Sequence, residues 1–125
     1  MMFGGPALGP IIFDEVQSAL QRFVDRPVYV HLETTNGAYA AERTEGSRTM
    51  AVCAYIRNTV VHLTGASIAG GGPYRAGLQM DQGWIYAEGL TDWEIDAQGR
   101  LLLAGHDQDH RLAVALELSL TPFPV

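Results

Sequence analysis

The chain is 125 residues long and 47% hydrophobic, which suits one domain with its own core. It carries 14 acidic residues and eight arginines but no lysine, for a formal net charge of −6. Nucleic-acid binding and electrostatic membrane anchoring both need clustered basic residues, so this scattered, minority set of arginines excludes both classes.

The sequence is expected to belong to a cytoplasmic protein. No run approaches the roughly 18 apolar residues that a membrane span requires, and the apolar start has no positive region typical of a secretory signal. The single cysteine, Cys53, cannot form an internal disulfide, which agrees with a reducing compartment.

The N-terminal part predicts a tail followed by one helix. Residues 1–13 are rich in glycine and proline and are expected to form the tail, which leaves residues 14–125 as a single domain. Asp14 and Gln17 have the spacing of a capping box, and an apolar face of helical period follows them. Pro27 is expected to end the helix.

Beyond Pro27 the hydrophobic period becomes two, which is typical of half-buried strands. Asn36-Gly37 predicts a hairpin turn, Asn58 is expected to end a strand, and Gly65 is expected to mark a bulge or kink. The predicted strands are 28–34, 38–43, 49–57, 59–69, 74–80, 83–90, 92–95, 100–106 and 111–120. The sequence therefore predicts a mainly β fold, a small antiparallel β-barrel or sandwich with one short N-terminal helix.

The glycine run 70–72, followed by Pro73, has two possible interpretations. A phosphate-binding loop would need a following helix, usually with a lysine and a serine or threonine, and this stretch has none of them. A bend between two strands needs only the conformational freedom of glycine and the rigidity of proline. The sequence therefore predicts a bend between two strands at residues 70–73.

Polar and aromatic side chains at alternating strand positions form the candidate binding site. His31 and Glu33 are two residues apart in a strand, so they share one face, and the carboxylate could orient the imidazole as a base. The alternative is an outward pair that is hydrated or bonded to a neighbouring strand. Arg75 could bind an anion or form an ion pair with Glu88 or Asp92. In a closed barrel a common pocket would be lined by Tyr29, His31, Glu33, His62, Arg75, Trp84, Tyr86 and Glu88.

The stretch HDQDH, residues 106–110, is the candidate metal site. His106 and His110 flank a short turn, and the aspartates between them could complete a divalent metal site. A solvated hairpin tip is the alternative interpretation. No HExxH, paired CxxC, GxSxG or GxGxxG pattern is present, so no cofactor and no complete catalytic set is predicted.

Several phrases, in order along the chain, resemble the YojF family of small bacterial proteins of unknown function. They are RPVYVHLETTNGAY, AYIRN, GGPYRAGL, GWIYAEGLTDWEID and GRLLLAGH, within residues 14–125. The resemblance implies a compact β-barrel-like domain with an N-terminal helix, and it brings no catalytic residues. It also implies an accessory role beside a zinc-dependent deacetylase of the LmbE type, in the metabolism of bacillithiol or a similar low-molecular-weight thiol.

Three hypotheses follow. The preferred one is a non-catalytic accessory or interaction protein that binds such a deacetylase. The second is a small-molecule-binding barrel with a pocket lined by Tyr29, His31, Trp84 and Tyr86. The third is a hydrolase or metal enzyme that uses His31 and Glu33, or His106 and His110. A homodimer is also predicted, on the expectation that strand 111–120 lies at an exposed sheet edge.

Overall fold

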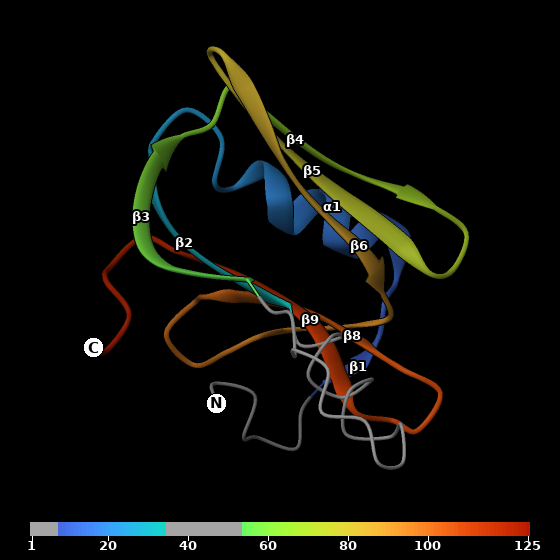
Figure 1. Ribbon diagram of the computed structural model, residues 1–125. Coiled ribbons are helices and arrows are strands. Elements are labelled where there is room, and N and C mark those ends of the chain that lie inside the picture. Colours follow the sequence, from blue (N-terminus) through green and yellow to red (C-terminus); the bar gives the residue numbers. More distant parts are fainter. Residues whose placement is uncertain (1–7, 35–53) are drawn as a thin grey trace.

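The computed structural model describes residues 8–34 and 54–125. In this part of the chain the fold is mainly β, with two antiparallel sheets and one short helix, α1 (Phe13–Gln21), as predicted (Figure 1). The described strands form two separate sheets and do not close into one barrel. No helix among these residues has the length and apolarity needed to cross a bilayer.

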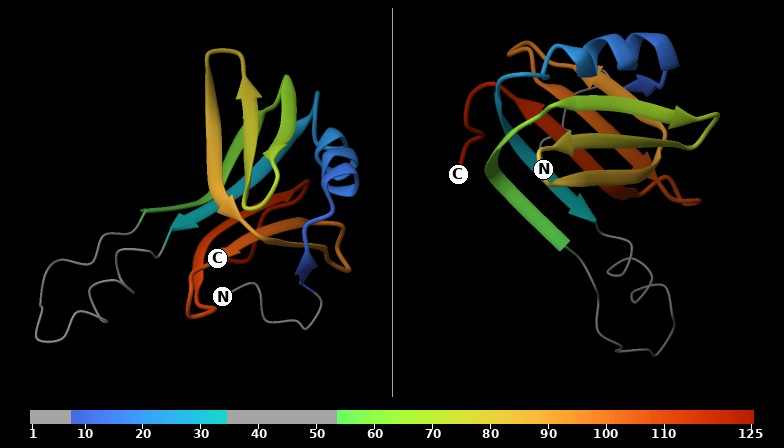
Figure 2. Two further views of the ribbon diagram at one scale, coloured as in Figure 1. Left: turned by 90° about the vertical axis from the view of Figure 1, so that its right-hand side faces the viewer. Right: turned by 90° about the horizontal axis from the view of Figure 1, so that it is seen from above.

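The larger sheet has six strands and the smaller has three. In spatial order the six-stranded sheet contains β1 (Gly9–Pro10), β7 (Asp92–Ile95), β8 (Leu101–His106), β9 (Leu112–Ser119), β2 (Pro27–Thr34) and β3 (Ala54–His62). The three-stranded sheet contains β4 (Gly65–Gly70), β5 (Tyr74–Met80) and β6 (Gly83–Leu90). Two further views show the smaller sheet rising from the larger one, with α1 alongside (Figure 2). Each sheet therefore has one face toward the core and one face away from it.

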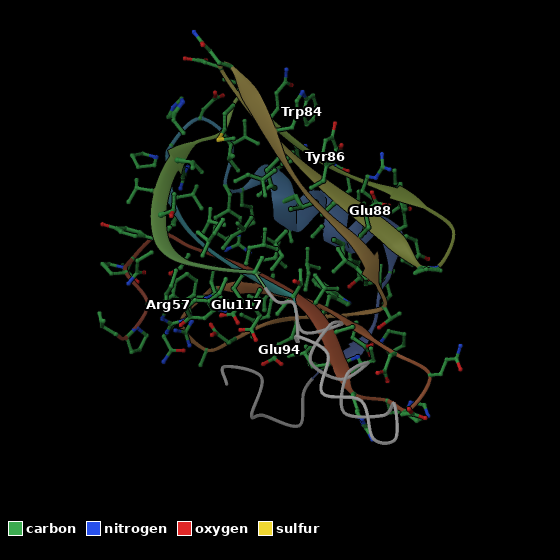
Figure 3. All side chains as sticks on the ribbon, in the orientation of Figure 1. Arg57, Trp84, Tyr86, Glu88, Glu94 and Glu117 are labelled. Carbon is green, nitrogen blue, oxygen red and sulfur yellow. The ribbon has the colours of Figure 1, made fainter. Side chains whose placement is uncertain are left out.

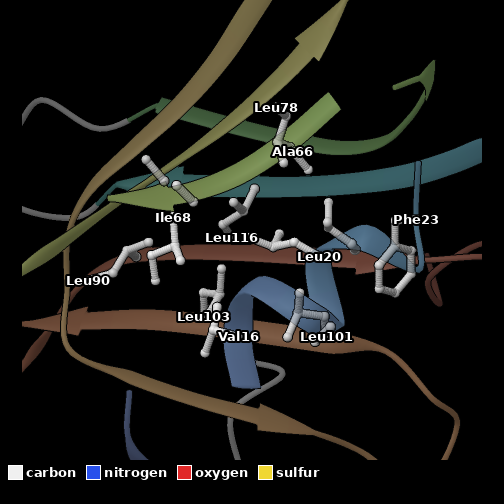
Figure 4. Close-up of a cluster of buried hydrophobic side chains, with 14 of the residues drawn as sticks. Val16, Leu20, Phe23, Ala66, Ile68, Leu78, Leu90, Leu101, Leu103 and Leu116 are labelled. Carbon is white, nitrogen blue, oxygen red and sulfur yellow. The ribbon is translucent and has the colours of Figure 1, made fainter. Parts of the chain in front are cut away.

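The core lies between the two sheets and α1. Leu103 and Leu116 from the larger sheet meet Ile68 and Leu78 from the smaller one, and Leu20 of α1 joins them (Figure 4). All five side chains are buried. Burial of this apolar surface is the main force that fixes which face of each sheet points outward.

The helix begins differently from the prediction. Its N-cap is Ile12, with no side-chain capping bond, and Asp14 lies inside the first turn, so the predicted capping box is wrong. The pairing of β1 with β7 fixes where the chain enters the helix. Gln17 bonds to β4 instead, donating to the carbonyl of Ala66 over 3.1 Å and accepting from the N–H of Ile68 over 3.0 Å.

Asn58 does not end a strand. It lies inside β3 with a φ of 59°, and the strand continues to His62. The break comes at Leu63 and Thr64, where the chain passes from one sheet to the other, because the Leu63 side chain enters the core and its carbonyl accepts from Asp25 N–H over 2.8 Å. The predicted strand 59–69 is thus two strands in different sheets. Residues 38–43, the Asn36-Gly37 turn and residues 49–53, with Cys53, lie outside the described residues.

Residues 70–73 form the predicted bend, which joins β4 to β5. Gly70 and Gly72 have φ values of 106° and 115°, a region that side chains other than glycine rarely adopt, and the Gly72–Pro73 peptide is cis. A Cβ on Gly70 would also lie 3.0 Å from the carbonyl oxygen of Pro73. The glycines therefore serve the turn itself.

Strand β9 lies in the interior of the six-stranded sheet, with β8 on one side and β2 on the other. Both of its edges are hydrogen-bonded, so the expectation of an exposed edge there is wrong. The outermost strands of the described sheet are β1 and β3. A homodimer stays a prediction, but an exposed edge of β9 no longer supports it.

Candidate functional site

The predicted binding residues divide into two groups on opposite sides of the molecule. Tyr29, His31 and Glu33 lie on β2, on the outer face of the six-stranded sheet, whereas the group Arg75, Trp84, Tyr86 and Glu88 lies on β5 and β6. Figure 3 shows Arg57 and Glu117 on the far side of the core from Trp84, Tyr86 and Glu88. His62 is exposed at the end of β3, opposite Pro27. Because the sheets do not close into a barrel, the two groups do not line one pocket.

The outer face of the smaller sheet carries an aromatic column, formed by Trp84, Tyr86 and Arg75. The rings of Trp84 and Tyr86 are parallel within 4° with centroids 5.5 Å apart, and the Arg75 guanidinium lies 5.2 Å from the Tyr86 ring centre. Arg75 also bonds to Glu88 over 3.0 Å, which confirms the predicted ion pair. Both aromatic side chains are 49% exposed, a high fraction for residues of this size.

Gly77 makes room for the column. It lies opposite Tyr86 in the β5–β6 pairing, where a Cβ would be 3.1 Å from Tyr86 Cε1 and 3.5 Å from Trp84 Cζ3. The two rings therefore lie over the bare backbone of β5, an arrangement that fixes their orientation. Beside the column, Arg75 and Glu88 line an open depression of about 290 Å³ next to the 70–73 bend.

The outer face of the larger sheet carries a buried charge cluster, formed by His31, Glu33, Arg57, Arg100 and Glu117. His31 is 2% exposed, its Nε2 lies 2.7 Å from Glu33 Oε1, and its Nδ1 lies 3.1 Å from Arg57 Nη1. An arginine can only donate, so Nδ1 accepts and Nε2–H donates to Glu33. The predicted His31–Glu33 pair is present, but both ring nitrogens are engaged, which leaves neither available to a substrate as a base.

A β-bulge positions Arg57. Two residues of β3, Arg57 and Asn58, stand opposite the single residue His31 of β2. Bulges of this kind turn side chains in new directions and are common near functional sites. The left-handed conformation of Asn58 completes the bulge, and asparagine is one of the few residues that tolerate it.

Residues 120–125, here called the strap, are held against this face. The Asn58 amide accepts from Phe123 N–H over 2.7 Å and donates to the Phe123 carbonyl over 2.9 Å. Arg57 Nε and Nη2 both donate to the carbonyl of Pro124, over 2.9 and 2.6 Å. The Phe123 ring, 1% exposed, lies 5.3 Å from the Arg57 guanidinium and 5.8 Å from that of Arg100.

Glu117 is the most unusual residue of the cluster. It stands opposite His31 on β2 and Leu102 on β8 and is fully buried, and neither carboxylate oxygen has a hydrogen-bond partner among residues 8–34 and 54–125. Burial raises the pKa of Glu117 from 4.5 to about 7, although the nearby guanidinium groups of Arg57 and Arg100 oppose this rise. The sequence offered one signal for this residue, the single charged side chain in the mostly apolar strand LAVALELS.

Arg100 is held by Asp96 in the turn before β8. Its Nε donates to Asp96 Oδ2 over 2.5 Å, and its backbone N–H donates to Oδ1 over 2.9 Å. Partial burial works to raise the pKa of Asp96, but the hydrogen bonds and charge of Arg100 outweigh it, and the pKa lies below its usual value. Arg100 is therefore a positive charge that is held in place and acts electrostatically on Glu117.

The predicted metal ligands lie at the β8–β9 turn. His106 and His110 line a depression of about 460 Å³ together with Asp92 and Asp107. His106 Nδ1 bonds to Asp92 Oδ1 over 3.2 Å, and Asp107 Oδ1 accepts from the backbone N–H groups of Asp109 and Arg111. Within residues 8–34 and 54–125, no three His, Cys, Asp or Glu side chains are grouped to hold a metal ion. This geometry adds no support to the metal prediction.

Comparison with known proteins gives a family but no activity. The profile of the family described as "Protein of unknown function (DUF1806)" matches residues 10–123. The chain is 52% identical over 115 residues to the "Uncharacterized protein YojF" of Bacillus subtilis (strain 168), covering 92% of this chain and 97% of that protein. The crystal structure of the Bacillus subtilis YojF protein is similar, with a TM-score of 0.77 and 46% identity over 95% of this chain and 99% of that one.

Proposed function

The chain belongs to the DUF1806 family, which includes Bacillus subtilis YojF, and we propose that it is a non-catalytic interaction protein. The observation that carries this proposal is the aromatic column on the outer face of the smaller sheet. Tryptophan, tyrosine and arginine are the residues most enriched among those that dominate binding energy at protein interfaces. Here all three are exposed side by side, and the two rings lie over the backbone of Gly77.

The column has the properties of a preorganised docking surface. Its two rings are parallel and lean on a strand, so little side-chain freedom remains to be lost on binding. The ion pair of Arg75 with Glu88 at one end leaves the surface close to neutral, although the chain as a whole is acidic. Such a surface suits a partner protein that presents an apolar patch with a polar rim.

The proposed partner is a deacetylase of the LmbE type, and the proposed role is that of an accessory subunit in low-molecular-weight thiol metabolism. The family resemblance of the sequence supports this partner. The engagement of both His31 nitrogens by Arg57 and Glu33 supports a role without catalysis at that pair. The aromatic column supplies a surface through which the two proteins would meet.

The test is direct binding between the two purified proteins, measured by isothermal titration calorimetry. We expect a complex that Trp84→Ala weakens at least about tenfold, because removing an aromatic residue of this kind typically costs 2 kcal/mol or more of binding energy. Tyr55→Ala is the matched control, since Tyr55 is 64% exposed but lies on β3 in the other sheet. The Tyr55→Ala variant should bind the deacetylase with the same affinity as the unaltered protein.

Two results would contradict the proposal. Absence of any complex at about 100 μM of each protein would remove the deacetylase as partner, because subunits that function together bind more tightly than this. Equal weakening by Trp84→Ala and Tyr55→Ala would remove the aromatic column as the docking surface. A circular dichroism spectrum of each variant identifies any loss of binding that comes from misfolding.

A further inference from the structure

The buried charge cluster contains an acceptor with no donor. Glu117 is fully buried and neither of its oxygens has a hydrogen-bond partner in the described part of the chain, whereas His31 bonds to Glu33 and Arg57, and Arg100 bonds to Asp96. A buried polar group without a partner is rare in proteins, and an ionised one is rarer still. The position therefore asks for a donor that the described chain does not supply.

The charges of the cluster do not balance when Glu117 is ionised. Arg57 and Arg100 are the positive groups that act on Glu117, and the other negative ones are Glu33 and Asp96. His31 is neutral in the tautomer that its two hydrogen bonds define. Among the described residues, three carboxylates against two guanidinium groups leave one uncompensated negative charge, and Glu117 is the carboxylate with no hydrogen-bond donor among these residues.

The hydrogen bonds that the described donors of the cluster make go to groups other than Glu117. His31 Nε2–H donates to Glu33, Arg57 donates to His31 and to the strap carbonyl of Pro124, and Arg100 donates to Asp96. Leu102, which stands opposite Glu117 on β8, has no side-chain donor. The missing group must therefore carry hydrogen-bond donors and a single positive charge.

We propose that Glu117 is the anchor of an enclosed binding site for the ammonium group of a small primary amine. An ammonium group has three donors and one charge, which matches the two free oxygens and the single net charge of the cluster. A divalent metal would need further ligands, and the described residues offer no such group. The sequence has no lysine, so no side chain of this protein carries an ammonium group.

The strap contacts the groups around Glu117. The Phe123 ring lies near both guanidinium groups that act on Glu117, those of Arg57 and Arg100, and its centre is 6.1 Å from that of the His31 ring. This site is on the far side of the core from the aromatic column, so it does not depend on the proposed docking function.

The test is a titration of the full-length protein with ethylammonium chloride at pH 8, followed by ¹H–¹⁵N NMR. We expect saturable shifts at the amides of His31 and of residues 116–118. Glu117→Gln should raise the dissociation constant at least about tenfold, because the neutral amide gives the ammonium group no opposite charge and a weaker hydrogen bond. Glu94→Gln, which alters another carboxylate of the six-stranded sheet, is the matched control and should bind normally.

Tetramethylammonium chloride at the same ionic strength tests the donors, since it has the charge without any N–H group, and it should give no saturable shift. Repeating the amine titration at pH 5.5 tests the charge without any substitution, because protonated Glu117 has no negative charge to offer. The proposal is overturned if no saturable shift occurs at pH 8, if Glu117→Gln binds as tightly as the unaltered protein, or if tetramethylammonium gives the same shifts. The spectrum of each variant shows whether it is folded.

Discussion

The raised pKa of Glu117 predicts how the free energy of unfolding depends on pH. Its pKa in the folded chain is about 7, against an ordinary value of 4.5. Between these two values the folded protein holds a proton that the unfolded chain has released, so the free energy of unfolding falls as the pH rises. A difference of this size corresponds to at most about 3 kcal/mol, lost between about pH 5 and pH 8.

The variant Glu117→Gln removes this dependence while keeping the shape of the side chain. We subtract the free energy of unfolding of the unaltered protein from that of the variant. This difference should be about 2 to 3 kcal/mol larger at pH 8 than at pH 5, because only the unaltered protein loses stability as the pH rises through this range. Any cost of burying the unpartnered amide is the same at both pH values and cancels in this comparison. The histidines and Asp96 are present in both proteins, so their contributions cancel as well.

Urea denaturation of both proteins at pH 5 and pH 8, without added amine, is the measurement. Tryptophan fluorescence can follow it, because Trp84 and Trp93 lie in different sheets. If the stability difference between the two proteins is the same at both pH values within about 0.5 kcal/mol, Glu117 is not a buried carboxyl group with a raised pKa. In that case the charge accounting behind the proposed ammonium site fails too.

Substitutions at three further positions test how the strap and the sheets are held. Asn58→Gly should be about 1 kcal/mol more stable than Asn58→Ala in thermal denaturation. Both variants lose the bonds to Phe123, but only alanine strains the left-handed backbone at this position, and equal stabilities would refute that strain. Phe123→Ala should lower the free energy of unfolding by about 3 kcal/mol or more in urea, and a loss below about 1 kcal/mol would show that the strap contributes little. Gly105→Ala should prevent folding, as judged by circular dichroism, since its Cβ would overlap the carbonyl oxygen of Gly89 and lie 2.8 Å from Val114 Cγ1; a native spectrum would contradict the β6–β8 packing.

Much of the fold follows from hydrophobic period and turn residues. The strands 74–80, 83–90 and 92–95 were predictable to the residue, because glycine or polar turns bound each of them. Asn58 misled the prediction, since asparagine usually ends a strand but here occupies a bulge inside one. The break at Leu63 and Thr64 was missed because Gly65, the glycine beside it, was interpreted as a bulge or kink inside one strand, whereas the chain changes sheets there and buries the Leu63 side chain.

The candidate sites were predictable only in part. Period two correctly placed His31 beside Glu33 and Trp84 beside Tyr86, because strand geometry alone decides which neighbours share a face. It could not say that the two pairs lie on opposite sides of the core, since that depends on which sheet each strand joins. Arg57, Arg100 and Glu117 come from three distant parts of the sequence, and only the order of strands brings them together.

The outer faces of the two sheets depart in opposite ways from the usual pattern of a small β domain. The smaller sheet leaves a tryptophan and a tyrosine half exposed, where polar residues would favour solubility. The larger sheet buries a carboxylate that has no hydrogen-bond partner among the described residues, where an apolar residue would favour stability. Departures of this kind are expected at functional sites, because elsewhere local preference and global fold agree. Since the core separates the two faces, substitutions at Trp84 and Glu117 act on different surfaces. The partner and the amine are thus separate hypotheses, and the failure of one leaves the other standing.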